Sequence, residues 1–169
     1  MQTRTAPPDG AARPAAAGTL VLALGNPLRG DDGAGAAVIR SLEDSGRLPD
    51  GVSLLDGGTP GLETVLLLHG YRRVIIVDAA EMGLEPGAWA RFTPEKVVSG
   101  ARDVSLRGTL HYAGLAEALK LGEALGILPP EIVIYGIQPL EVGWQPGLSA
   151  PVRAAVPAVC AAILDELTE

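Results

Sequence analysis

The stretch VIIVDA, residues 74–79, decides the fold. Its first four side chains are branched and apolar, without the alternation of apolar and polar residues that marks a half-exposed strand. Such runs are typical of strands buried on both faces, as in a parallel sheet covered by helices. An acid, Asp78, stands near its carboxyl end. We therefore expect VIIVDA to be the central strand of a parallel sheet.

Apolar runs alternate with helical patterns on both sides of this stretch, which is the signature of an α/β domain. The sequence predicts a three-layer sandwich with a central, twisted, mostly parallel five-stranded sheet. We expect the last helix to be kinked by Pro157, and residues 94–109 fit no element. The further strands are expected at 19–25, 52–56, 88–93 and 131–137, and the helices at 34–44, 62–69, 113–125 and 150–167.

Length and composition indicate one domain. The chain has 169 residues, and 47% of them are hydrophobic, which suffices for one core. Residues 1–17 are rich in Ala and Pro, so we expect a flexible tail before a single domain at 18–169. No apolar run is long enough to span a membrane. Cys160 is the only cysteine, which excludes an internal disulfide and favours a cytoplasmic protein. Because its helix is apolar, we interpret Cys160 as a packing residue.

The net charge of the chain favours some classes of binding partner over others. The formal net charge is -7, whereas a nucleic-acid-binding domain usually carries basic groups that neutralise phosphates. The balance favours a protein, a small molecule or a cation as the partner.

Acidic residues follow three of the expected strands, at the sheet edge where ligands of α/β proteins bind. Asp31 and Asp32 stand before a helix, where one acid suffices as a cap. We expect Asp31 to cap and Asp32 to have a functional role. For Asp56, an Asx turn and a functional role remain equally open. Asp78 ends a buried strand, and a desolvated carboxylate needs a partner or a cation, so we expect it to be functional.

The chain has two histidines. His69 ends a helix, where a cation complements the helix dipole, and we expect a structural role. His111 stands before the next helix. It is either a surface or capping residue, or the nitrogen ligand of a site with two carboxylates. Such a mixed set of oxygen and nitrogen donors suits nickel or zinc and leaves coordination positions open.

Five blocks, spread over most of the chain, resemble the hydrogenase maturation proteases in the order in which they occur. They are LVLALGNPLRGDDGAGAAVIRSLE (residues 20–43), LLDGGTPGLE (54–63), VIIVDAAEMG (74–83), LHYAGLAEAL (110–119) and GIQPLEVGWQPGLSAPVRAAVP (136–157). The resemblance implies a phosphorylase/hydrolase-like fold. It also implies an endopeptidase, of aspartic or metal-dependent type, that removes the C-terminal extension of a [NiFe]-hydrogenase large-subunit precursor.

By position, the resemblance implies that Asp32, Asp78 and His111 are the catalytic and metal-binding residues. The first position is often Glu in that family, so Asp32 is one methylene shorter. The metal would be nickel carried by the precursor and used as a recognition tag, and no organic cofactor is implied. The alternative is a chaperone that senses nickel with the same three ligands but does not cleave.

Two rival classes fit poorly. A peptidyl-tRNA hydrolase shares the Gly-Asn-Pro turn, but it requires a basic surface and a histidine soon after that turn. This chain is acidic and has no histidine before His69. A nucleotide-binding domain is disfavoured because GNPLRGDDG is not a G-x-G-x-x-G loop, and two acids beside a phosphate would repel it.

Overall fold

The structure is a computed structural model that describes residues 18–100 and 110–169, with only the backbone described at 110–113. The expected tail, 1–17, lies outside the described residues, so the boundary at residue 18 stays a prediction. In chain order the elements are β1 (Thr19–Ala23), the 3-10 turn η1 (Gly30–Gly33), α1 (Ala34–Ser45), β2 (Val52–Asp56), the 3-10 turn η2 (Gly61–Glu63), α2 (Thr64–Leu68), β3 (Arg73–Ala79), β4 (Trp89–Phe92), α3 (Pro94–Gly100), α4 (Leu110–Leu125), β5 (Glu131–Ile137) and α5 (Ala150–Thr168).

The strands form one five-stranded sheet in the order β2-β1-β3-β5-β4. β1, β2, β3 and β5 are parallel, and β4 joins the edge beside β5 in the antiparallel sense. β3 therefore lies in the centre, as VIIVDA predicts, and its side chains from Val74 to Ala79 are all buried. The expected mostly parallel five-stranded sheet is confirmed.

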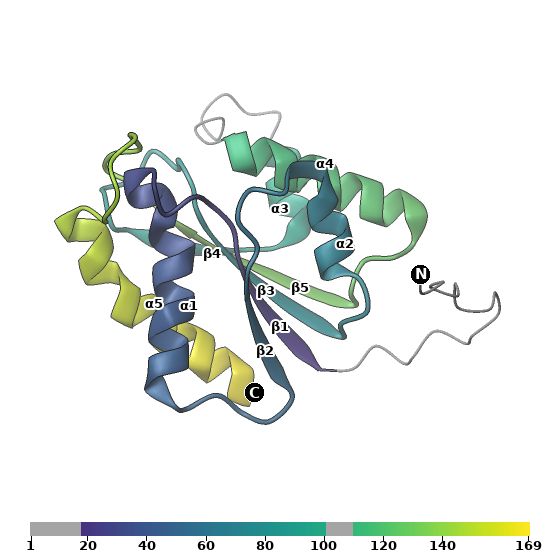
Figure 1. The fold of residues 1–169 in the computed structure, drawn as a ribbon. Coiled ribbons are helices and arrows are strands. Elements are labelled where there is room, and N and C mark those ends of the chain that lie inside the picture. Colours follow the sequence, from purple (N-terminus) through teal and green to yellow (C-terminus); the bar gives the residue numbers. More distant parts are fainter. Residues whose placement is uncertain (1–17, 101–109) are drawn as a thin grey trace, which may run out of the picture.

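Helices cover both faces of the sheet, which makes three layers (Figure 1). Alternate side chains of the central strands pack against different helices, because successive strand residues point to opposite faces. Val21, Ile75 and Val77 belong to the cluster packed with α1 and α5. Leu20, Leu22 and Ile76 belong to the cluster that contains residues of α2, α3 and α4.

The boundaries differ from the expectation mainly on the α4 face. α3 was not predicted, because its seven residues, PEKVVSG, combine Pro, Gly and β-branched Val, which favour helix weakly. α4 begins at Leu110, three residues before the expected start, so His111 lies in its first turn. Pro157 lies inside α5 without ending it. In the described part of the chain, no helix is long and apolar enough to cross a membrane.

A buried carboxylate fastens α5 to the sheet. Glu166 accepts hydrogen bonds from Arg91 Nη2 (2.6 Å), Arg73 Nη2 (3.0 Å) and the hydroxyl of Tyr135. Arg73 also pairs with Glu131, at 2.9 Å from Nε to Oε1. Burial by itself would raise the pKa of Glu166, but the hydrogen bonds from Arg91 and Tyr135 and the charge of Arg73 outweigh it and lower the pKa. The cluster therefore ties the last helix to three strands.

Replacing Glu166 by Gln should lower the free energy of unfolding by about 2–3 kcal/mol at pH 7, because it leaves the half-buried Arg73 less well compensated. Since the folded pKa of Glu166 is lowered, its contribution is present above the unfolded value of about 4.3 and is lost as pH falls through the folded pKa. Denaturant titrations should thus show wild type and variant converging at acidic pH. Glu43→Gln, on the exposed side of α1, is the matched control. A pH-independent difference would contradict this account.

Candidate active site at the carboxyl edge of the sheet

The strand order reverses between β1 and β3. From β1 the chain moves outward through α1 to β2, and it then crosses through α2 to β3 on the other side of β1. Parallel α/β sheets bind ligands at the carboxyl ends of the strands beside such a reversal. We therefore expect functional side chains in the loop after β1 and at the end of β3.

Asp78 stands at this position. It is 1% exposed and pairs in register with Gly136 of β5. β1 ends at Ala23, opposite Val77, so Asp78 lies one residue beyond the last β1 pair. Strand alternation turns its side chain away from the α1 and α5 face, since both neighbours pack on that face. Its carboxylate is thus directed to the face that α2 and α4 cover.

Asp32 lies on the neighbouring loop. It belongs to η1, between β1 and α1, and is 1% exposed. Its Oδ2 accepts a hydrogen bond from the backbone N–H of Asn26 at 2.9 Å. The chain turns sharply at Gly25, whose φ is 117°, and a Cβ there would lie 2.1 Å from the carbonyl oxygen of Asp32. Only glycine permits this approach, which folds Asp32 back over the end of β1. Because η1 also packs on β3, both aspartates lie at one edge of the sheet.

The backbone of His111 lies in the first turn of α4. That end of α4 packs against η2, where a Cβ on Gly114 would lie 3.1 Å from Cα of Gly61. η2 follows β2 at the carboxyl edge of the sheet, so the helix start belongs to the same region (Figure 1). The side chain of His111 lies outside the described residues, and the convergence of the three expected ligands stays a prediction. Within the described residues alone, no three acidic, His or Cys side chains are grouped as metal ligands.

Asp31 is structural, but the expectation that it caps the helix is wrong. Neither η1 nor α1 has a side-chain cap hydrogen bond. Instead the buried carboxylate of Asp31 binds the loop before α5. Its Oδ1 accepts from Ser149 N at 2.7 Å, and its Oδ2 accepts from Leu140 N at 2.8 Å, Glu141 N at 3.1 Å and Ser149 Oγ at 2.7 Å. With both oxygens engaged, Asp31 is a clamp between two loops rather than a ligand.

Gln138 is a positioning residue that the sequence analysis missed. It follows β5 and is 3% exposed. Its Oε1 accepts from the backbone N–H groups of Met82 and Leu84, at 2.7 and 3.2 Å, and its Nε2 donates to Glu81 Oε1 at 2.7 Å. These bonds hold the loop that follows Asp78. Its position in the sequence was the available signal, since this polar residue directly follows the buried strand β5, much as Asp78 lies at the carboxyl end of β3.

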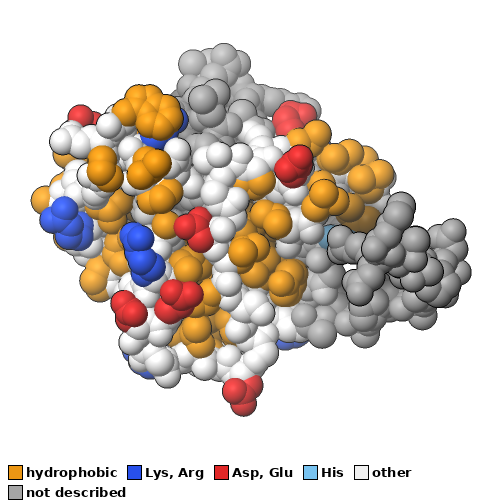
Figure 2. Space-filling view, viewed as in Figure 1, with side chains coloured by type: hydrophobic (Ala, Val, Ile, Leu, Met, Phe, Trp, Pro, Cys, Tyr) orange, Lys and Arg blue, Asp and Glu red, His pale blue; other side chains and the backbone are white. Residues whose placement is uncertain are grey.

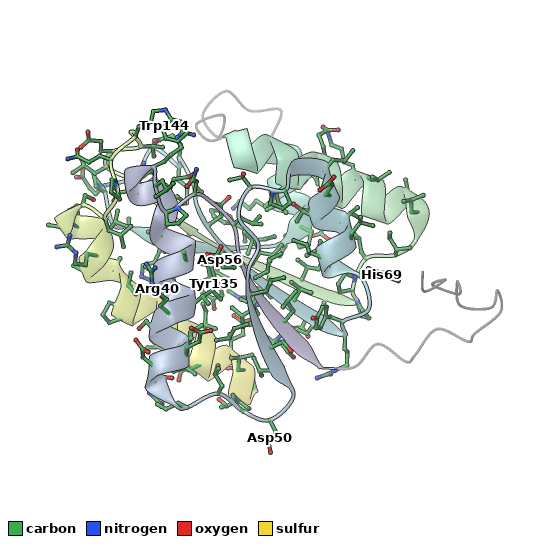
Figure 3. All side chains as sticks on the ribbon, in the orientation of Figure 1. Arg40, Asp50, Asp56, His69, Tyr135 and Trp144 are labelled. Carbon is green, nitrogen blue, oxygen red and sulfur yellow. The ribbon has the colours of Figure 1, made fainter. Side chains whose placement is uncertain are left out.

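Three further residues were considered in the sequence analysis, and Figure 3 labels two of them, Asp56 and His69. Exposed Asp56 accepts from the N–H of Gly58 at 3.2 Å, which is an Asx turn. His69 is exposed and directly follows α2. Cys160 is buried, its thiol donates to the carbonyl of Val38, and burial raises its pKa. The expected packing role of Cys160 is confirmed.

A separate cavity lies away from these side chains. A cavity of about 610 Å³ lies between α3, the second half of α4 and the segment that enters β5. Its lining includes Glu131, the first residue of β5, whereas Asp78 pairs with Gly136 near the end of that strand. The cavity therefore opens at the amino edge of the sheet and is not part of the candidate site.

The clamp formed by Asp31 predicts that different substitutions lower the free energy of unfolding by different amounts. Asp31→Ala removes all the acceptors of the clamp and should cost about 3 kcal/mol, and Ser149→Ala should cost about 1 kcal/mol because the backbone bonds remain. Burial by itself would raise the pKa of Asp31, but the hydrogen bonds to its carboxylate outweigh this effect, so the pKa is lowered. Its contribution is therefore complete above about pH 4 and is lost as pH falls through the lowered pKa. Denaturant titrations measure the series, with exposed Asp50→Asn as the control. Equal losses for Asp31→Ala and Asp50→Asn would refute the clamp.

Known proteins match this architecture and these segments. The family model described as hydrogenase maturation protease matches residues 36–166. The hydrogenase expression/formation protein HupD of Rhizobium leguminosarum is 36% identical over 148 residues, which cover 86% of this chain and 71% of that protein. The coenzyme F420 hydrogenase subunit delta of Methanothermobacter thermautotrophicus is 31% identical over 157 residues, covering 88% and 93%.

Solved structures agree with these relatives. The hydrogenase maturating endopeptidase HybD of Escherichia coli superposes with a TM-score of 0.78 at 28% identity, covering 89% of this chain and 92% of that one. The [NiFe] hydrogenase maturation protease HybD of Thermococcus kodakarensis gives 0.70 at 29% identity, covering 90% and 99%. The family model spans most of the chain, the relatives exceed 30% identity, and the fold is shared. The chain therefore belongs to the hydrogenase maturation protease family.

Proposed function

We propose that this chain is the endopeptidase that removes the C-terminal extension of a nickel-loaded [NiFe]-hydrogenase large-subunit precursor. The observation that carries the proposal is the pair of buried carboxylates, Asp32 and Asp78, at the edge of the sheet where the strand order reverses. Membership of the maturation protease family supplies the reaction class. The cytoplasm is the compartment we expect for this protein.

In this proposal Asp32, Asp78 and His111 complete the coordination of nickel that the precursor already holds. Carboxylates and imidazole both suit divalent nickel, and a nearby cation favours the charged form of a carboxylate. The backbone holds both carboxylates in fixed positions, as coordination of a metal requires. Asp78 ends a central strand, and Asp32 is held by the N–H of Asn26.

Binding through the metal would fix the precursor tail in register against the protein, which is catalysis by positioning. A carboxylate of the pair, or the bound metal, could then activate a water molecule for attack on the peptide carbonyl. Either route makes the charge of Asp78 essential. Precursor without nickel would not be cleaved, because it carries no metal for the three ligands to bind.

Removing the charge of either buried aspartate should abolish cleavage without unfolding the protein. Asp78→Asn and Asp32→Asn keep the side-chain shape, so we expect near-wild-type melting temperatures and a loss of at least about 100-fold in cleavage rate. His111→Ala should have the same effect. Asp56→Asn is the matched control, because an amide oxygen also supports the Asx turn. Cleavage is followed by mass spectrometry. Full activity of Asp78→Asn would refute the assignment.

Nickel in the substrate, rather than metal stored in the protein, should control the reaction. Wild-type protein is stripped with a chelator, the chelator is removed, and precursor with or without nickel is added. We expect the nickel-loaded precursor to lose its C-terminal extension and the nickel-free precursor to stay intact. Equal cleavage of both would refute nickel recognition. Tight, nickel-dependent binding without cleavage would instead favour the alternative, a nickel-sensing chaperone with the same three ligands.

A further inference from the structure

An exposed apolar surface borders the candidate site. It consists of Leu28, Leu140 and Trp144, which are 61%, 58% and 79% exposed, together with Arg29, and we call it the rim surface. Leu28 and Arg29 lie in the loop after β1, and the other two lie in the loop before α5. Figure 3 places Trp144 at the outer end of its loop, and Figure 2 shows hydrophobic side chains gathered in that region. Exposed apolar side chains grouped in this way mark interaction sites.

The two loops of the rim surface are held together before any partner arrives. Gly30 N donates to the carbonyl of Gln145 at 2.7 Å, and Asp31 N donates to the carbonyl of Glu141 at 3.0 Å. The buried carboxylate of Asp31 adds its bonds to Leu140, Glu141 and Ser149. A preformed surface binds with a smaller loss of conformational entropy than two independent loops would.

Arg29 gives the rim surface a specific chemistry. Its guanidinium carbon lies 5.1 Å from the centroid of the Trp144 ring, which is cation–π stacking. Its buried Nε has no hydrogen-bond acceptor among the described residues. A stacked guanidinium still presents N–H groups in its plane, and these groups match a carboxylate. Trp and Arg are also the residue types that contribute most to binding at protein interfaces.

The rim surface is continuous with the candidate site. Asp32 N donates to the carbonyl of Arg29 at 3.3 Å, so the stacked cation and the buried acid belong to the same turn. A polypeptide whose metal is bound at Asp32 would therefore lie close to these loops.

We propose that the rim surface docks the large-subunit precursor itself, through a segment with an apolar side chain next to an acidic one. The apolar group packs on Trp144 and Leu140, and the carboxylate binds Arg29. This inference rests on the proposed function and adds a second, metal-independent contact to it. The contact increases affinity for the precursor without entering the reaction, so its loss raises KM and leaves kcat unchanged.

The test compares single variants in binding and cleavage of purified nickel-loaded precursor. Trp144→Ala and Arg29→Gln should each raise the Kd and the KM about 10-fold or more, with kcat within about twofold of wild type. Trp144→Phe and Arg29→Lys, which keep a ring and a charge, should recover part of the loss. Arg29→Glu should bind more weakly than Arg29→Gln. Salt should weaken wild-type binding by screening the attraction, and it should relieve the repulsion in Arg29→Glu.

Matched controls separate the rim surface from exposed residues in general. Leu140→Ser should weaken binding, whereas Leu125→Ser should not, although Leu125 at the end of α4 is also 58% exposed. Arg40→Gln, on the exposed side of α1, controls for the loss of a positive charge. Melting temperatures of all variants should stay near wild type, because these side chains are outside the core.

Each outcome decides between the two proposals. If wild type cleaves and the rim variants keep its Kd and KM, the rim surface is refuted and the protease stands. If wild type binds without cleaving, the protease is refuted, and the rim surface stands or falls with the Kd of its variants. If wild type neither binds nor cleaves, both are refuted. If the variants change only self-association, measured by sedimentation, the surface joins two copies of this chain and the proposal is wrong.

Discussion

Burial of the central strands on both faces is the constraint on which the rest of the structure depends. β1 and the part of β3 before Asp78 carry few polar side chains, because helices exclude water from both faces. The polar side chains that could take part in a reaction therefore lie at the strand ends, where Asp78 and Gln138 follow apolar runs. The parallel arrangement brings those ends to one edge, and the reversal of strand order between β1 and β3 opens that edge. The candidate site is thus a consequence of the same burial that stabilises the sheet.

The loop from Gln138 to Ser149 is the second organising element, and it acts through hydrogen bonds rather than apolar packing. At its start, Gln138 holds the loop after β3. Two residues later and at its end, its backbone N–H groups donate to Asp31 in the loop after β1. One irregular segment therefore holds both the loop that carries Asp31 and Asp32 and the loop that follows Asp78. A fully hydrogen-bonded polar network of this kind specifies a single arrangement more strictly than apolar contact does.

Patterns of neighbouring residues predicted the features of this molecule that depend on short stretches of sequence. The boundaries of β2 and β5 follow from apolar runs closed by turn residues, and the central place of β3 follows from the lack of alternation in VIIVDA. α3 was missed, since Val97 joins the core only through tertiary packing, and the start of α4 at Leu110 was placed three residues too late. The clamp of Asp31 was missed for a related reason. Its partners lie more than 100 residues away, and no local pattern distinguishes a distant clamp from a helix cap.

The adjacent acids Asp31 and Asp32 show why residue type alone does not assign a role. Both are buried to the same degree, and both stand in the same 3-10 turn. Asp31 has both oxygens engaged by donors from the distant loop, so a cation would have to compete with four hydrogen bonds. Asp32 faces back toward Gly25 and Asn26 at the end of β1, on the side where Asp78 ends β3. Successive residues of a tight turn point in different directions, so one acid can fix the loop while its neighbour is presented at the sheet edge. The pair therefore couples stability to function in one turn, since a loosened Asp31 clamp would also displace Asp32.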